Sequence, residues 1–189
     1  MKYTEKIHRA IKFAAKTHQH YQDQKRKGKD IPYITHPLTV ALILALHEAD
    51  EDVICAGILH DTIEDSSEDK KVTAEMLTER FGKNVSDLVV SVTDNKQLKK
   101  EERKAEVLER LKTFSHDSIM LKSADVLNNI AEILDDHGRY GDITFKRFSE
   151  SKEKTIEKYL KIISVLVGRW PESPLKDELE ALASELKKL

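Results

Sequence analysis

The chain contains little cysteine, glycine and proline, and it has no long hydrophobic run. Its 189 residues include one cysteine, six glycines and four prolines. The single Cys55 excludes an internal disulfide and fits a reducing cytoplasm, and its apolar neighbours predict a core residue rather than a catalytic thiol. Because no apolar run reaches the length of a bilayer span, we expect no membrane segment. Residues Met1–Lys6 also lack the apolar core of a signal peptide.

Net charge is also small, although charged residues are abundant. The chain has 32 lysines and arginines against 34 aspartates and glutamates, and a formal net charge of -2. This balance argues against bulk electrostatic binding of nucleic acid. The length predicts one domain with a sizeable core. We expect residues 1–170 to form it and residues 171–189 to add a C-terminal helix packed on the same domain.

Apolar residues recur at helical spacing in most segments, which predicts an all-α fold. The expected helices are 4–24, 35–46, 53–65, 73–82, 85–93, 117–134, 145–167 and 174–189. Stretch 85–93 is rich in β-branched residues, but a helix is favoured because neighbouring segments offer no partner strand. The charged stretch 96–110 indicates an exposed helix or a mobile loop, and its lysine-rich part, 96–104, indicates a solvated face.

Several helix ends carry local signals. Thr35 or His36 is a candidate cap for one helix, with a proline in its first turn. Thr73 is a candidate cap for another helix, which Gly82 is expected to end. The leucines of 174–189 alternate spacings of four and three residues, which predicts packing on the domain or, alternatively, a dimer contact. The oligomeric state therefore stays open.

The stretch Leu59–Asp65 concentrates residues that bind metals or transfer protons. In a continuous helix, His60 would lie one turn from Glu64, and Asp61 one turn from Asp65. Crowded carboxylates repel one another unless a cation neutralises them, which favours a metal site. The alternative is a helix end with a few solvated acids.

Residues far away in the sequence could complete such a site. His36 stands at an expected helix start, and Asp125 borders the apolar face of 117–134, where a carboxylate needs a partner or a cation. Lys122 and Asn129 lie one turn to either side of Asp125 and can face the same cavity. Two imidazoles and two carboxylates suit manganese, iron or zinc, which acidify bound water and polarise phosphoryl oxygens.

These residues resemble the HD superfamily of metal-dependent phosphohydrolases, through His36, the His60-Asp61 pair and Asp125. A closer resemblance, to the alarmone hydrolase domain of RelA/SpoT-type proteins, rests on motifs in family order over roughly residues 4–168. These motifs are Arg26-Lys27-Gly28, Pro32 to Pro37 (PYITHP), His60 to Asp65 (HDTIED), Phe81-Gly82, Val92-Thr93, and Lys122 to Asp125 (KSAD) with Asn129.

The resemblance implies an all-α HD-domain helical bundle and one divalent metal, commonly Mn²⁺, with Fe²⁺ or Zn²⁺ as alternatives. The implied metal ligands are His36, His60, Asp61 and Asp125. It further implies that Glu64 and Asp65 support attack of water on the 3′-pyrophosphate of ppGpp, which gives GDP or GTP and pyrophosphate.

The implied partner is a small-molecule nucleotide, with no nucleic acid and no membrane. The resemblance places Arg26, Lys27 and Asn129 at the nucleotide. By its position in the chain, Lys122 either reaches a phosphate or neutralises the acids near Asp125.

The chain departs from the family pattern after Asp125. The family run Arg-Leu-His-Asn is here Val126-Leu127-Asn128-Asn129, and the segment His18–Lys25 differs in spacing from the family. These changes spare the metal residues and bear on the substrate. Another HD-family nucleotidase or nucleotide phosphatase is therefore the alternative function, and the intact metal set disfavours a non-enzymatic nucleotide-binding module.

The remaining histidines are assigned to structural roles. We expect His18 and His20 to serve packing rather than the pocket. Surfaces and loops are expected for the other four, which are His8, His47, His116 and His137.

Overall fold

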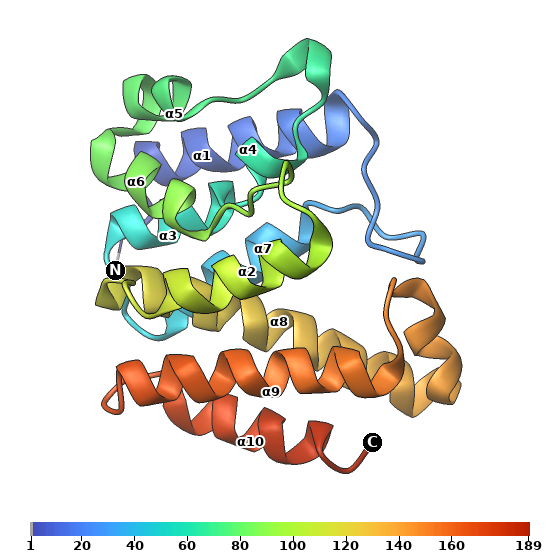
Figure 1. Cartoon of the computed structure of the whole chain (residues 1–189). Coiled ribbons are helices and arrows are strands. Elements are labelled where there is room, and N and C mark those ends of the chain that lie inside the picture. Colours follow the sequence, from blue (N-terminus) through green and yellow to red (C-terminus); the bar gives the residue numbers. More distant parts are fainter. Residues whose placement is uncertain (1) are drawn as a thin grey trace.

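The computed structural model describes residues 2–189 and is built from helices, with no strand within that range (Figure 1). The α-helices are α1 (Glu5–Ala15), α2 (Thr35–Leu46), α3 (Glu51–Leu59), α4 (Thr62–Asp65), α5 (Ala74–Phe81), α6 (Lys83–Val92), α7 (Lys100–Leu111), α8 (His116–Tyr140), α9 (Lys152–Arg169) and α10 (Lys176–Leu186). A π-helical turn spans Lys16–His20, and 3-10 turns span Glu68–Lys70 and Gly141–Arg147. The all-α prediction is confirmed.

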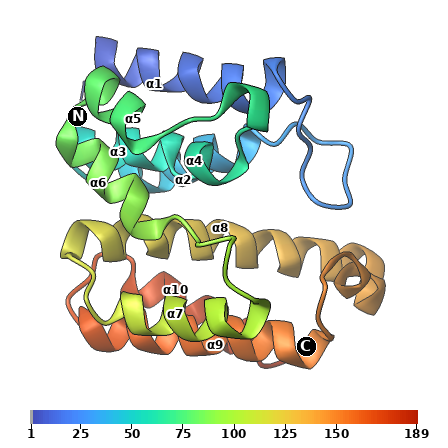
Figure 2. The same cartoon turned by 45° about the horizontal axis from the view of Figure 1, so that its top comes forward.

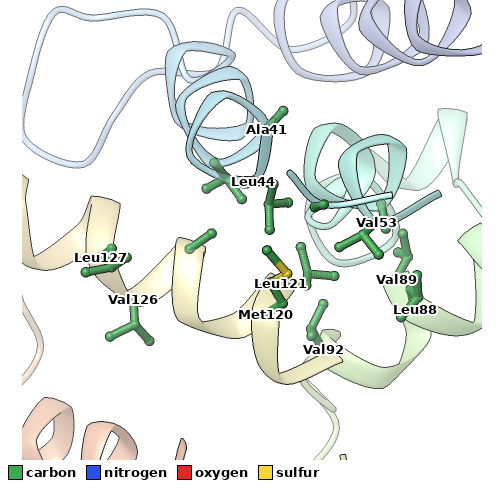
Figure 3. Close-up of a cluster of buried hydrophobic side chains, with 14 of the residues drawn as sticks. Ala41, Leu44, Val53, Leu88, Val89, Val92, Met120, Leu121, Val126 and Leu127 are labelled. Carbon is green, nitrogen blue, oxygen red and sulfur yellow. The ribbon is translucent and has the colours of Figure 1, made fainter. Parts of the chain in front are cut away.

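The long helix α8 runs through the middle of the molecule, between two groups of helices (Figure 2). It packs against α2, α3 and α6 on one side, and against α9 and α10 on the other. Figure 3 shows Leu121 of α8 among Leu44 of α2, Val53 of α3 and Val89 of α6, all of them buried. A helix that is apolar on several sides has to lie inside the fold.

The helix α10 lies against α8 and α9. Its leucine stripe faces inward, because Leu175, Leu179 and Leu186 are almost completely buried within the chain itself. The stripe therefore packs on the fold, as the first of the two interpretations proposed. The boundary at residue 170 stays a prediction. Among residues 2–189, the structure has no helix with both the length and the apolar character needed to cross a membrane.

Two expected helices have different ends in the structure. The first helix, expected over 4–24, ends at Ala15 and gives way to the π-helical turn. The helix α8 continues through residues 135–140, where a loop was expected, and ends at Gly141 with φ 63°. Buried Asp136 explains the extension, because it pairs with Lys29 and Arg147 and so fixes this last stretch of helix.

The last long helix was expected to begin at Phe145. The structure has a 3-10 turn over Gly141–Arg147, and α9 begins only at Lys152, after a cap by the Ser151 hydroxyl. The stretch 85–93, assigned to a helix despite its β-branched residues, lies in α6 and at its C-terminal end, as predicted.

The predicted helix caps were partly correct. Thr73 accepts a hydrogen bond from the Met76 backbone N–H and caps α5, and Gly82 ends that helix with φ 92°. The prediction for α2 was wrong, because Thr35 is already helical and its hydroxyl donates instead to the Pro32 carbonyl, at 2.8 Å.

Close contact between α2 and α3 depends on Gly57. A Cβ atom there would lie 2.6 Å from Leu44 Cδ1 and 3.5 Å from Ala41 Cα, and Leu44 is fully buried. We expect Gly57→Val to lower the free energy of unfolding by about 1–3 kcal/mol through overpacking. The measurement is urea unfolding. Gly168→Val is the matched control, since nothing lies within 4 Å of a Cβ at Gly168 in α9. Equal stability of the two variants would contradict the close packing of α2 and α3.

Candidate functional site

The His60-Asp61 pair interrupts the helix that was expected over 53–65. The helix α3 ends at Leu59, and α4 begins at Thr62. At this break, His60 Nδ1 donates to the Gly57 carbonyl at 2.8 Å, and the Thr62 hydroxyl donates to the Leu59 carbonyl at 2.7 Å. In a continuous helix, neighbouring side chains point about 100° apart. Here they converge, with His60 Nε2 only 3.1 Å from Asp61 Oδ2.

Four side chains from three parts of the fold meet at one buried point. His36, at the start of α2, places its Nε2 atom 3.2 Å from His60 Nε2 and 3.6 Å from Asp61 Oδ2. The same atom lies 3.3 Å from Oδ1 of Asp125, on α8. His36, His60 and Asp125 are buried, and their donor atoms all lie within 4.8 Å of one another. The predicted metal ligands are thus brought together, although their role as ligands stays a prediction.

Hydrogen bonds on the outer side of each imidazole fix its tautomer. His60 Nδ1 donates to a carbonyl, and His36 Nδ1 donates to Asn128 Oδ1 at 2.6 Å. Each Nε2 atom therefore points to the shared centre, where it can carry a proton or, once it has lost that proton, bind a metal. The two Nε2 atoms lie 3.2 Å apart beside two carboxylates, an arrangement that favours a cation at the centre, either a proton on His60 or a metal ion in its place. The residues present fit a divalent metal ion.

The electrostatics of the cluster also favour positive charge at its centre. Burial by itself would lower the pKa of His60, but the neighbouring Asp61 and Asp125 raise it to about 9. Burial by itself would raise the pKa of Asp61, but His60 and His36 hold this pKa far below its usual range. Lys122 and His36 do the same for the pKa of Asp125, again against the effect of burial. Both carboxylates therefore stay ionised inside the protein.

The two carboxylates are held by neutral and cationic donors. The Tyr33 hydroxyl donates to Asp61 Oδ2 at 2.5 Å, and burial together with the charge of Asp61 raises the pKa of Tyr33, so it keeps its proton. Lys122 Nζ donates to Asp125 Oδ2 at 2.8 Å, and Asn129 Nδ2 donates to Asp125 Oδ1 at 2.6 Å. Lys122 was expected either to reach a phosphate or to neutralise the acids near Asp125, and the structure shows the contact with Asp125. The role of Tyr33 was missed, because a tyrosine in a loop carries no periodic signal.

The candidate catalytic acids, Glu64 and Asp65, point to different places. Glu64 lines the small cavity that contains the four candidate ligands, and its Oε2 atom accepts the Asp94 backbone N–H at 3.1 Å. Burial, followed by the charge of Asp61, raises the pKa of Glu64. Asp65 does not line that cavity, and instead bonds to Lys96, at 2.7 Å, and to Gln24, at 3.2 Å. The two acids were predicted to act together, so this separation was not predicted.

A small cavity of about 170 Å³ contains the metal-site residues and shares a wall with a larger one of about 870 Å³. Six residues line both: Tyr33, Glu64, Asp94, Lys122, Asp125 and Asn129. The larger cavity lies among α7, α8 and α9 and is rich in cations. The cations contributed by α7 and α9 are Lys100, Arg103, Lys104, Lys154, Lys158 and Lys161. The stretch 96–104, predicted to be a solvated face, is exposed at Lys96, Lys99 and Lys100, and its Lys100, Arg103 and Lys104 also line this cavity.

The predicted basic pair divides between the two cavities. Arg26 lines the small one, where it donates to Asn129 Oδ1 at 3.0 Å and to Glu132 Oε2 at 3.0 Å, and lies 5.6 Å from the Tyr33 ring centre. Lys27 lines the larger one, next to the ring of Phe148. Glu132, which also pairs with Lys29 at 2.9 Å, was missed. Its spacing from Asn129 could have identified it as part of the same helix face.

The remaining histidines agree only in part with their structural assignment, because His20, which was expected to serve packing, is exposed. His18 is fully buried, whereas His8, His20 and His116 are exposed. His18 is nevertheless bonded to Gln24, which contacts Asp65. Cys55 is buried and free, as expected for a core residue.

We expect His60→Ala to reduce the divalent metal content, because the change removes one of four converging donors. Metal content is measured by elemental analysis after loading with Mn²⁺ and desalting. His20→Ala is the control, since it removes an exposed histidine from the same chain. Equal metal content in the two variants would show that the metal, if bound, lies elsewhere.

Curated relatives match most of the chain. A guanosine-3′,5′-bis(diphosphate) 3′-pyrophosphohydrolase of Aquifex aeolicus is 36% identical over 182 residues, which cover 94% of this chain and 23% of that protein. The protein of Danio rerio named guanosine-3′,5′-bis(diphosphate) 3′-pyrophosphohydrolase MESH1 is 39% identical over 126 residues, which cover 65% of this chain and 66% of that protein. The matched part of the chain thus spans less than two thirds of the length of each.

A solved structure shares the fold over the whole chain. It is described as "A metazoan ortholog of SpoT hydrolyzes ppGpp and plays a role in starvation responses". The likeness has a TM-score of 0.79 at 25% sequence identity, and covers 100% of this chain and 99% of that one.

A family model described as HD domain matches residues 10–142. The matched segment contains all four side chains that converge at the buried centre, from His36 to Asp125. Because this match spans more than half of the 189 residues, the chain belongs to the HD domain family.

Proposed function

We propose that the chain is a divalent-metal-dependent hydrolase that removes the 3′-pyrophosphate of guanosine alarmones such as ppGpp. The observation that carries the proposal is a cluster of four candidate metal ligands, three of them buried, at a cavity that adjoins a larger, cation-lined one. A polyanionic nucleotide fits such a pair of cavities, because lysines and arginines can contact its phosphates. The names of the two relatives, both guanosine-3′,5′-bis(diphosphate) 3′-pyrophosphohydrolases, support the choice of substrate.

The metal would be held by His36, His60, Asp61 and Asp125, and we propose Mn²⁺. When bound, it supplies an acidified water molecule and polarises the phosphoryl oxygen under attack. The protein's own part is to orient the ligands. Asn128 holds His36, and Tyr33 holds Asp61. Asn128, which differs from the family pattern, thus acts on a candidate metal ligand, so its departure bears on the metal site as well as on the nucleotide.

Glu64 is the group proposed to accept the proton of the attacking water. It faces the small cavity, and its raised pKa suits a base better than that of an ordinary solvated glutamate. Asp65 acts on Glu64 indirectly, because it binds Lys96, whose Nζ atom lies 3.7 Å from Glu64 Oε1.

The nucleotide is proposed to lie along Arg26, Lys27 and Asn129. Arg26 is held in a fixed plane by Glu132 and Asn129, and a planar guanidinium can stack on a base or contact phosphate. Lys122 borders both cavities, between the candidate metal site and the lysines of α7 and α9.

We also propose that the chain acts in the cytoplasm, where it would remove alarmone in the stringent response. The free, buried Cys55 is compatible with a reducing compartment. The partner in this role is the small-molecule nucleotide itself.

The direct test incubates purified, manganese-loaded protein with ppGpp and a panel of other nucleotides, and identifies the products. We expect GDP and pyrophosphate from ppGpp, and loss of activity after chelation, because the metal supplies the acidified water. Release of orthophosphate from another nucleotide, with ppGpp left intact, would support the alternative of an HD-family nucleotidase or phosphatase instead.

We expect Glu64→Gln to keep its metal and to lose about 10²- to 10⁴-fold in turnover, because an amide cannot accept the proton. Turnover and metal content are measured on the same preparation. Glu68→Gln, at an exposed glutamate in the following loop, is the matched control. Loss of metal would make Glu64 a ligand rather than a base, and full activity of a Glu64→Gln, Asp65→Asn double variant would remove both acids from the mechanism.

A further inference from the structure

Asp65 is fixed on several sides although it lies outside both cavities. Gln24 Nε2 donates to its Oδ2 atom at 3.2 Å, and Lys96 Nζ donates to its Oδ1 atom at 2.7 Å. A third side chain, Gln22, donates to the Asp65 backbone carbonyl at 2.7 Å. Three donors from two separate loops thus hold one residue at the end of α4.

The orientation of the Gln24 amide is set by His18. The Gln24 Oε1 atom lies 2.8 Å from His18 Nδ1, on the opposite side of the amide from Asp65. The two ends of an amide have almost the same shape, so only their partners decide which end points where. A flipped amide would place Oε1 against the Asp65 carboxylate, which is repulsive. A proton on His18 Nδ1 therefore selects the arrangement in which Gln24 donates to Asp65.

The environment of His18 keeps the proton on that nitrogen. Its ring is fully buried, and its Nε2 atom has no hydrogen-bond partner within residues 2–189. A buried N–H group without a hydrogen-bond partner costs more free energy than a buried ring nitrogen that carries only a lone pair. The proton therefore belongs on Nδ1. Burial also lowers the pKa of His18, which keeps the ring neutral.

The backbone before Gln24 is shaped to make this contact. His18 lies in the π-helical turn Lys16–His20, a rare element that often marks functional sites. Asp23, directly before Gln24, adopts φ 45°, in the left-handed region that residues other than glycine seldom occupy. The His18 ring also lies 5.1 Å from the Tyr33 ring, whose hydroxyl holds Asp61. One buried ring therefore supports a partner of Asp61 and a partner of Asp65.

We propose that His18 and Gln24 are positioning residues, which fix Asp65 and, through it, hold Lys96 beside Glu64. The path runs from His18 Nδ1 to Gln24, from Gln24 to Asp65, and from Asp65 to Lys96, which also donates to the Glu64 carbonyl at 2.9 Å. This proposal rests on the proposed function, in which Glu64 accepts the proton from water. Glu64 then depends on a neighbouring charge that is held in place by groups outside the cavity.

The test compares Gln24→Met with Gln19→Met in the full chain. Gln19 belongs to the same segment, but its amide bonds to Asp23 rather than to Asp65. For Gln24→Met we expect kcat for ppGpp to fall about 10- to 100-fold, with KM, metal content and melting temperature unchanged, because a misplaced group costs rate rather than binding. Gln19→Met is expected to match the wild type. An unchanged kcat for Gln24→Met, or a change in KM alone, would overturn the proposal.

Two variants of His18 test the choice of amide orientation. His18→Asn keeps an N–H group near the position of Nδ1, and is expected to retain most of kcat. His18→Leu removes the donor and is expected to resemble Gln24→Met. Equal kcat values for the two would contradict the role assigned to Nδ1. If either variant fails to fold, the Gln24 comparison still decides the proposal.

A crystal structure of Gln24→Met separates this proposal from the proposed function. If wild-type protein leaves ppGpp intact, the function fails. The structure then still shows whether Asp65 and Lys96 have moved, as the proposal requires, or have kept their places, which would overturn it.

Discussion

The repulsion among four buried polar groups is the constraint on which the rest of the structure depends. The Nε2 atoms of His36 and His60 and the carboxylates of Asp61 and Asp125 meet at distances of 3.1–3.6 Å, largely shielded from bulk water. Such an arrangement is costly unless a cation neutralises it and each group is held from outside. The outer contacts are present for all four, and they come from a backbone carbonyl, a tyrosine, two asparagines and a lysine. The imidazole contacts leave both Nε2 atoms facing the centre, whereas Tyr33 and Asn129 donate to the same carboxylate oxygens that face it, Asp61 Oδ2 and Asp125 Oδ1. Each of these oxygens has a second lone pair for a metal ion.

The helix α8 links this centre to the core and to the larger cavity. Its apolar side chains pack between the two helix groups, and one face carries Lys122, Asp125, Asn129 and Glu132 at helical spacing. Asp125 reaches the candidate metal site, whereas Glu132 holds Arg26 at the edge of the small cavity. A shift of α8 would therefore change the core, the candidate metal site and the proposed nucleotide-binding residues together. Strong packing on both sides of the helix protects that geometry.

The sequence predicted the helices and the composition of the site well, because both leave short-range patterns. Apolar spacing identified α2, capping signals identified α5, and the lack of partner strands led to α6, while the distant His36, His60 and Asp125 were grouped correctly in space. Crowded histidines and carboxylates need a cation between them, so the residue types alone were informative. Their roles as metal ligands and catalytic groups remain predictions.

What the sequence did not predict depends on contacts between distant segments. At the break, His60 and Asp61 both contact His36 of another segment, a long-range arrangement that the periodicity of residues 53–65 could not reveal. The extension of α8 needs Asp136 to meet Lys29, more than 100 residues away. The contact between Lys96 and Asp65 was missed for the same reason. A run of lysines looks the same whether it faces solvent or a cavity.

The most direct test of the metal centre is a crystal structure of the protein grown with Mn²⁺, with anomalous diffraction data collected to locate the ion. The account predicts one strong anomalous peak within bonding distance of His36 Nε2, His60 Nε2, Asp61 and Asp125. A peak at another place, or one that leaves His36 or Asp125 out of coordination, would contradict it.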